Sequence, residues 1–148
     1  MGGWNEMVVH KSVTIQTKKY NEFILITELA EQAVRESGIQ EGVVFVITDH
    51  TTMGITVNES LECLESDLSN MLARLAPEDY PYAHARMLPT YGATAGNPTG
   101  HMKSHLTGNH CVMRVMDGKL SRGGAQEIYL AEFDGPARRT IWFTVMGD

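Results

Sequence analysis

The chain has 148 residues, 43% of them hydrophobic, which is sufficient for one domain with its own buried core. Its formal net charge of −6 disfavours binding to nucleic acid, whose phosphates select basic surfaces. No apolar run approaches the roughly 20 residues of a membrane span, and the first residues lack the pattern of a secretion signal. We therefore expect a cytoplasmic protein with no nucleic-acid and no membrane partner. Its two cysteines, Cys63 and Cys111, are expected to be buried free thiols.

Strand and helix patterns succeed one another in the first half of the chain. We predict strands at residues 7–15, 23–26, 43–48 and 54–58, and helices at residues 28–37 and 61–75. Thr27 is expected to cap the first helix, and Gly38 to end it in a left-handed conformation. The second helix is predicted by leucines at three- and four-residue spacing, and Pro77 ends it.

The segment from Pro77 to about Gly100 has no hydrophobic periodicity. It contains four prolines, several glycines, His84 and the tyrosines Tyr80, Tyr82 and Tyr91. Aromatic residues seldom gather in a solvated linker, so we interpret this segment as a binding loop.

Short strands dominate the remainder of the chain. Residues 111–116 and the strand from Leu120 flank Asp117-Gly118, a strong hairpin signal, and further strands are expected at residues 128–133 and 140–146. No internal repeat or second domain is evident. The predicted fold is α+β: a single compact domain over residues 1–148, with a strand-rich mixed or antiparallel sheet and two main helices.

The most informative polar segment lies between Asp49 and Glu59 and has the sequence Asp-His-Thr-Thr-Met-Gly-Ile-Thr-Val-Asn-Glu. It follows the apolar run at residues 43–47, which we expect to be a strand buried on both faces. Polar groups at the end of such a strand are held rigidly, where desolvation alters their chemistry. The alternation around Ile55 and Val57 predicts a second strand. The two strands would form a short apolar hairpin with polar groups at both ends, and thereby a pocket.

Histidines are the main candidates for metal ligands or catalysts. His101 and His105 have the i, i+4 spacing that places two imidazoles on one helical face. A third ligand, His50 or His84, would complete a zinc site. The alternative for each of these histidines is an ordinary hydrogen-bonded loop residue. His10 is expected to be exposed on a strand.

Other ionisable residues have both a functional and a structural interpretation. Glu59 and Asp67 are candidate carboxylates, but Glu59 also favours a helix N-terminus electrostatically and Asp67 also suits a solvated helix surface. Lys103 lies between two histidines and is suited to hold a phosphate or a carboxylate, although most lysines so placed are merely exposed.

Several segments, in order along almost the whole chain, resemble the YjbQ family, often labelled secondary thiamine-phosphate synthase. They are His50-Thr51-Thr52, Ile55-Thr56-Val57-Asn58-Glu59, Asp67-Leu68, Tyr82-Ala83-His84, Gly100-His101-Met102-Lys103-Ser104, Asp117-Gly118-Lys119-Leu120, Gln126-Glu127-Ile128, Glu132-Phe133-Asp134-Gly135-Pro136, Arg138-Arg139 and Met146-Gly147-Asp148. The chain differs from the family pattern where Gly124-Ala125, rather than Thr-Trp, precede Gln126, and where residues 90–98 lengthen the loop before His101.

The resemblance implies an α+β subunit that assembles as a homotrimer, with a polar site near the subunit contacts. It also implies weak thiamine-phosphate synthase activity, in which an aminopyrimidine pyrophosphate is joined to a thiazole phosphate with loss of pyrophosphate. The expected catalytic residues are His50, Glu59 and Lys103. The expected substrate contacts are Thr51, Thr52, Asn58, Asp67 and Gln126, and the expected metal ligands are His50, His84, His101 and His105.

Three functions follow from these residues. The first is a small transferase acting on phosphorylated heterocycles, in which Lys103 or a bound metal stabilises the diphosphate leaving group. The second is a metal- or metabolite-binding protein without catalysis. The third is metal-assisted hydrolysis with Glu59 as the base. A divalent cofactor, zinc or magnesium, is expected in the third function and compatible with the first.

Overall fold

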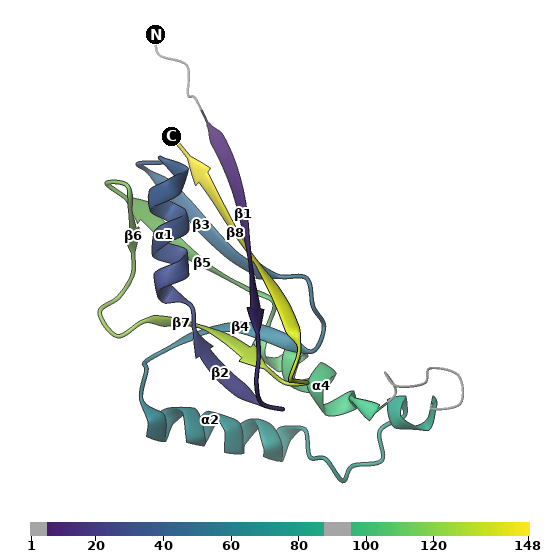
Figure 1. Ribbon diagram of the computed structural model, residues 1–148. Coiled ribbons are helices and arrows are strands. Elements are labelled where there is room, and N and C mark those ends of the chain that lie inside the picture. Colours follow the sequence, from purple (N-terminus) through teal and green to yellow (C-terminus); the bar gives the residue numbers. More distant parts are fainter. Residues whose placement is uncertain (1–5, 88–95) are drawn as a thin grey trace.

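Eight strands form two antiparallel sheets in the part of the chain that the computed structural model describes, residues 6–87 and 96–148 (Figure 1). The five-stranded sheet has the order β1 (Met7–Gln16), β8 (Arg138–Gly147), β3 (Gly42–Thr48), β5 (His110–Met116) and β6 (Lys119–Ser121). The three-stranded sheet has the order β2 (Glu22–Leu25), β7 (Glu127–Glu132) and β4 (Met53–Asn58). The start of β1 lies beside the end of β8, because Met7 pairs with Gly147.

Three α-helices and one 3-10 helix accompany these strands in the described residues. They are α1 (Thr27–Ser37), α2 (Glu62–Leu75), α4 (Pro98–Thr107) and the 3-10 helix η1 (His84–Met87). The predicted α+β class is confirmed, but α4 was not expected as an element. Its sequence, PTGHMKSHLT, has little apolar periodicity, and the available signals were Pro98 in its first turn and the histidine spacing. The predicted binding loop ends in this helix, and Tyr91 lies outside the described residues.

The prediction that residues 43–48 and 54–58 form one hairpin is wrong. β3 pairs with β5 and β8, whereas β4 pairs with β7 in the other sheet. The two strands instead bring Val46 and Ile55 into one core from different sheets. The prediction that β3 is buried on both faces is also wrong, because Val44 and Val46 are fully buried while Phe45 is only half-buried.

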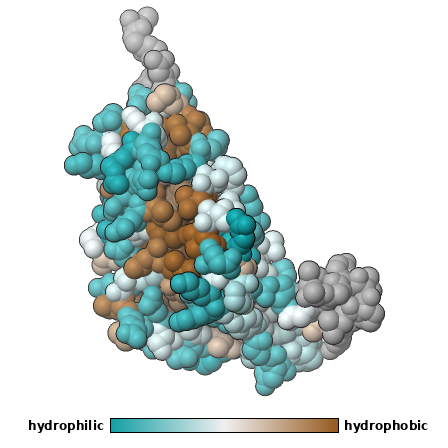
Figure 2. All heavy atoms as spheres, viewed as in Figure 1, coloured by the Kyte–Doolittle hydropathy of each residue, from teal (hydrophilic) through white to brown (hydrophobic). Residues whose placement is uncertain are grey.

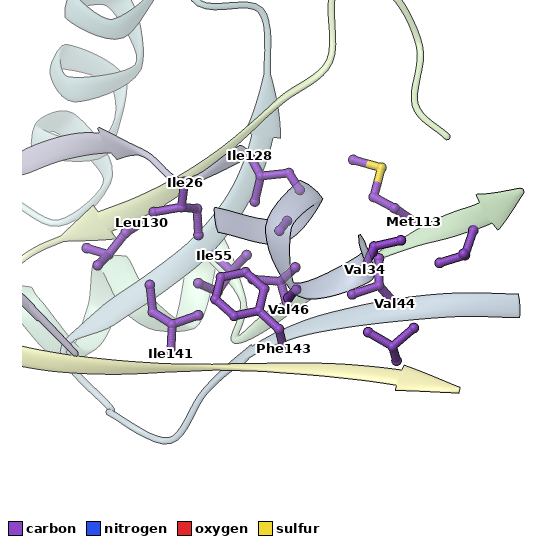
Figure 3. Close-up of a cluster of buried hydrophobic side chains, with 14 of the residues drawn as sticks. Ile26, Val34, Val44, Val46, Ile55, Met113, Ile128, Leu130, Ile141 and Phe143 are labelled. Carbon is purple, nitrogen blue, oxygen red and sulfur yellow. The ribbon is translucent and has the colours of Figure 1, made fainter. Parts of the chain in front are cut away.

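The main core lies between the two sheets and α1 (Figure 3). Phe143 and Ile141 of β8 meet Val46 of β3 there, and Leu130 of β7 and Val34 of α1 complete the contact. Hydrophobic burial of this kind contributes most of the free energy of folding.

Two of the predicted turns are confirmed. Gly38 follows α1 with φ of 74°, the left-handed conformation that glycine adopts without strain. Asp117 and Gly118 have φ of 52° and 72°, as a two-residue hairpin turn between β5 and β6 requires. The predicted cap at Thr27 is wrong: its hydroxyl accepts a hydrogen bond from the Ile128 N–H and donates one to Glu127, so it connects α1 to β7.

Apolar side chains remain uncovered on several parts of the surface. In α2 only Leu72 is buried, while Leu61 just before the helix and Leu75 at its end are 44% and 60% exposed. Figure 2 shows a further apolar patch beside α1, over the region of β1 and β8. Cys63, expected to be buried, is exposed because it lies on the solvent side of α2. None of the described helices is long and apolar enough to cross a membrane.

Candidate functional site

A cavity of about 870 Å³ lies between the end of β3 and α4. We call it the α4 cavity. It is lined by Ile47, Thr48, Asp49, His50, Thr51, His101, Met102, Ser104, His105, Gly108 and Asn109. Two anchors connect α4 to β4 beside it: the Ser104 hydroxyl donates to the Met53 carbonyl at 2.7 Å, and the Ile55 N–H donates to the Gly108 carbonyl at 3.1 Å. Strands of both sheets therefore position its walls.

His50 is held by the backbone of β8. Its Nε2 accepts a hydrogen bond from the Thr140 N–H at 3.1 Å, so the ring proton of the neutral imidazole resides on Nδ1. Burial lowers the pKa of His50 below its ordinary 6.5, and the nearby Arg139 charge lowers it further. His50 is therefore a neutral hydrogen-bond donor in this arrangement. It is unsuited to bind a metal through Nδ1, because that atom carries the proton.

His101 and His105 both line the α4 cavity, from one face of α4. His84 is not among the lining residues, but its ring meets that of His101 edge to face, with 5.2 Å between the ring centroids. The Nε2 of His84 donates to the Asn97 side chain at 3.0 Å, and the Asn97 amide donates to Asp134 at 2.8 Å. His84 thus supports His101 from outside the cavity.

The histidines do not assemble a metal centre within the residues that the structure describes. Among residues 6–87 and 96–148, no three His, Cys, Asp or Glu side chains lie close enough together to hold a metal ion. His101 and His105 give two of the three protein ligands that a catalytic zinc site requires. A third would have to come from elsewhere than His50, whose Nε2 is occupied by Thr140.

A buried ion pair between Arg139 and Glu132 holds Thr52, the residue that follows Thr51 of the cavity wall. Arg139 donates to both carboxylate oxygens of Glu132, and these side chains are only 5% and 0% exposed. The same guanidinium donates to the hydroxyl and the carbonyl of Thr52, at 2.9 and 3.2 Å. Thr52, predicted to contact substrate, is therefore buried in this network and positions the neighbouring Thr51 and His50.

Lys103 lies on the opposite side of α4 from the histidines. It is only 6% exposed and lines a second cavity of about 250 Å³, formed with Asn21–Phe23, α2 and the end of β7. Residues two positions apart on a helix face different directions, so the separation of Lys103 from His101 follows from helical geometry. Within one chain, Lys103 and the histidines line different cavities rather than the one polar site that the family resemblance implied. Burial lowers the pKa of Lys103.

The other predicted site residues lie away from the α4 cavity. Asn58 is the last residue of β4 and Glu59 follows it, so Asn58 lies roughly 20 Å from Thr52 at ~3.3 Å per strand residue. Asp67 is exposed on α2. Gln126 is exposed in a turn, where its side-chain carbonyl accepts the Gly123 N–H at 2.8 Å. The wrong hairpin prediction explains why Asn58 and Glu59 lie away from the cavity. Because β3 and β4 belong to different sheets, the polar residues at the end of β4 do not lie beside those at the end of β3.

The sequence matches the model of the family described as UPF0047 protein YjbQ-like over residues 11–148. The chain belongs to the YjbQ family. Among its relatives, YugU of Bacillus subtilis is 37% identical over 93% of this chain and 98% of its own length. MJ1081 of Methanocaldococcus jannaschii is 35% identical over 90% of this chain and 91% of its own length.

Solved YjbQ-family structures have the same fold. A YbjQ-like protein of unknown function from Sulfolobus solfataricus superposes with a TM-score of 0.88 at 27% identity, covering 97% of this chain and all of its own. A YjbQ-family protein from Clostridium acetobutylicum gives a TM-score of 0.82 at 33% identity, covering 91% and 98% of the two chains. Family membership therefore establishes the fold, and the activity has to be argued from the side chains.

Sequence reasoning missed several residues that build the site of this YjbQ-family chain. Asn109 lines the α4 cavity, and Glu132 and Arg139 form the ion pair that holds Thr52 next to Thr51 of its wall. The available signal for the ion pair was the position of two opposite charges in strands with otherwise buried inward-facing residues. Charged residues are almost never fully buried unless paired, so such a pattern predicts a buried pair.

Proposed function

We propose that the protein is an enzyme that acts on a small phosphorylated metabolite in the α4 cavity, with weak thiamine-phosphate synthase-type activity. The single observation that carries the proposal is that His50, His101 and His105, from two distant segments, line one cavity. Neutral imidazoles near physiological pH serve both as hydrogen-bond donors and as proton acceptors. In the proposed reaction the thiazole nitrogen attacks the methylene carbon of the aminopyrimidine, and pyrophosphate leaves with the bonding electrons.

The donors around the cavity support this chemistry. The Nδ1–H of His50 is fixed by the bond at its other nitrogen, and preorganised donors stabilise charge that develops on a leaving group. Asp49 and Asn109 are suited to bind an amino-substituted ring. Within one chain, Lys103 cannot stabilise the charge on the leaving group, because it lies on the other side of α4 from this cavity. His101, His105 or a divalent metal such as zinc or magnesium would have to complement the phosphates.

Two alternatives differ in their chemistry. A protein that binds a metabolite without catalysis would use the same cavity, and it is distinguished by saturable binding without turnover. Metal-assisted hydrolysis with Glu59 as base is less well supported, because Glu59 lies at the far end of β4 from the cavity. The metal content of the purified protein distinguishes this second alternative from the transferase.

We expect a His101→Ala variant to lose at least about 100-fold in turnover of the aminopyrimidine pyrophosphate and the thiazole phosphate, the usual size of a general acid–base contribution. The measurement is steady-state formation of thiamine phosphate. A His10→Ala variant is the matched control, because that imidazole is exposed on β1 and does not line the α4 cavity. Equal rates in the two variants would contradict the catalytic role proposed for His101.

We also propose that the protein is a homotrimer. The support is the apolar surface that one chain leaves uncovered: Val112 and Met116 of β5 are each 47% exposed, and Leu75 of α2 is 60% exposed. Uncovered apolar surface of this kind marks protein interfaces. Light scattering is expected to give three times the 16.4 kDa of one chain. A mass equal to one chain would contradict this assembly.

A further inference from the structure

Lys103 is a buried cation with a single neutral partner. Its side chain is 6% exposed, and its ammonium donates one hydrogen bond, to the Asn21 side-chain carbonyl at 3.2 Å. The described residues place no carboxylate in an ion pair with it. Burying an ammonium without a counter-ion is costly, and buried charges in proteins are normally paired.

The two carboxylates that line the same cavity accept hydrogen bonds from groups other than Lys103. Both oxygens of Glu132 accept from Arg139, and they also accept from the Thr17 hydroxyl and from two backbone N–H groups. Glu22 uses one oxygen to accept from the Lys18 and Lys19 N–H groups. Glu78, outside this cavity, is near enough for its charge to favour the protonated form of Lys103, but it forms no ion pair with the ammonium, and its Oε1 accepts from Tyr20 and Thr99. A bound anion would give Lys103 the direct ion-pair partner that the described residues do not provide.

We propose that the cavity around Lys103 is a binding site for a small oxyanion, either inorganic phosphate or the carboxylate of a small metabolite. Its volume of about 250 Å³ suits such a ligand. Asn70 and Ser69 of α2 also line the cavity and are exposed, so they give it a polar entrance from solvent. Amide and hydroxyl groups donate to anionic oxygens, and a charged ammonium strengthens such bonds.

This site goes beyond the proposed function, because it lies on the other side of α4 from the histidines. The two cavities share no lining residue. Loss of His101 is therefore expected to leave oxyanion binding intact, and loss of Lys103 is expected to weaken it. The failure of one proposal does not imply the failure of the other.

The test is titration of the full-length protein with inorganic phosphate and, separately, with acetate at matched ionic strength, read as the rise in Tm. A ligand that binds only the folded state raises Tm saturably. We expect a saturable rise in wild type, Lys119→Met and His101→Ala. In Lys103→Met we expect the apparent Kd to be at least about tenfold weaker, as for the loss of a charge-assisted hydrogen bond. A response to phosphate but not acetate identifies phosphate as the ligand class, and the reverse identifies a carboxylate.

A second measurement uses only wild-type protein, so it does not depend on the folding of the Lys103 variant. Phosphate or acetate is expected to slow acetylation of Lys103 by acetic anhydride, measured by peptide mass spectrometry, and to leave acetylation of Lys119 unchanged. Stabilisation that is equal in Lys103→Met and wild type would overturn the proposal. So would a reduced oligomer mass in Lys103→Met without any effect of the anions, because the counter-ion would then be a carboxylate of a neighbouring copy.

Discussion

A Glu132→Gln variant is expected to lose about 3–5 kcal/mol of unfolding free energy, because the Arg139 guanidinium would remain buried without its carboxylate. The two side chains are 0% and 5% exposed, so water cannot replace the lost charge. Urea denaturation measures the loss as a lower transition midpoint. The matched control is Glu36→Gln, which breaks the exposed ion pair with Lys11 and is expected to change the midpoint little.

The same carboxylate gives the protein a defined sensitivity to acid. Burial alone would raise the pKa of Glu132, but hydrogen bonds from Arg139, Thr17 and the Asp134 N–H outweigh burial and hold that pKa below its ordinary 4.5. The unfolded state consequently binds the proton more tightly. The stabilisation is complete above about pH 4.5 and is lost as the pH falls through the folded-state pKa. A Glu132→Gln variant with the same midpoint and acid sensitivity as wild type would show that the pair is not buried.

Phe143→Ala is expected to cost about 3–5 kcal/mol, because it removes a fully buried ring and leaves a cavity in the main core (Figure 3). Phe143 of β8 packs with the cluster that contains Ile55, Leu130 and Val34, and so connects both sheets to α1. Equilibrium unfolding in urea gives the change in free energy. A loss below about 1 kcal/mol would contradict the position of this ring.

Phe45→Ala is the control, since Phe45 lies in the neighbouring strand β3 but on the opposite face of the sheet, where it is half-buried. In a single chain its loss is expected to cost clearly less than the loss of Phe143. If Phe45→Ala also lowers the oligomer mass, the outer face of the five-stranded sheet forms part of the subunit contact.

Local patterns predicted most of the elements because their causes are local. The Asp117-Gly118 turn and the end of α1 at Gly38 depend on backbone conformations that few residues adopt, and both were found where expected. Strand partners depend on distant residues. Nothing near Thr48 indicates that β3 pairs with β5 and β8, while β4 joins β7. Because the predicted pairing of β3 with β4 was wrong, Asn58 and Glu59 lie outside the pocket in which they were expected.

The candidate site was predictable in part. The placement of His101 and His105 on one side of α4 followed from their spacing, and the end of β3 does bring His50 to the same cavity. The opposite orientation of Lys103 would have followed from the same spacing if residues 98–107 had been recognised as a helix. The engagement of His50 by Thr140 depends on a contact between residues 90 positions apart, which periodicity cannot show.

The bond from the Thr140 amide to His50 has one further consequence. The donor belongs to the main chain, so replacement of the Thr140 side chain leaves it in place, and the imidazole turns only if β8 itself moves. The opposite wall is attached in a similar way, through Ser104 and Gly108 to β4. A cavity whose two walls are both attached to strands reorganises little when a ligand binds. Its selectivity is therefore expected to come from the fixed shape of the cavity, which excludes ligands that do not fit, rather than from an induced conformational change.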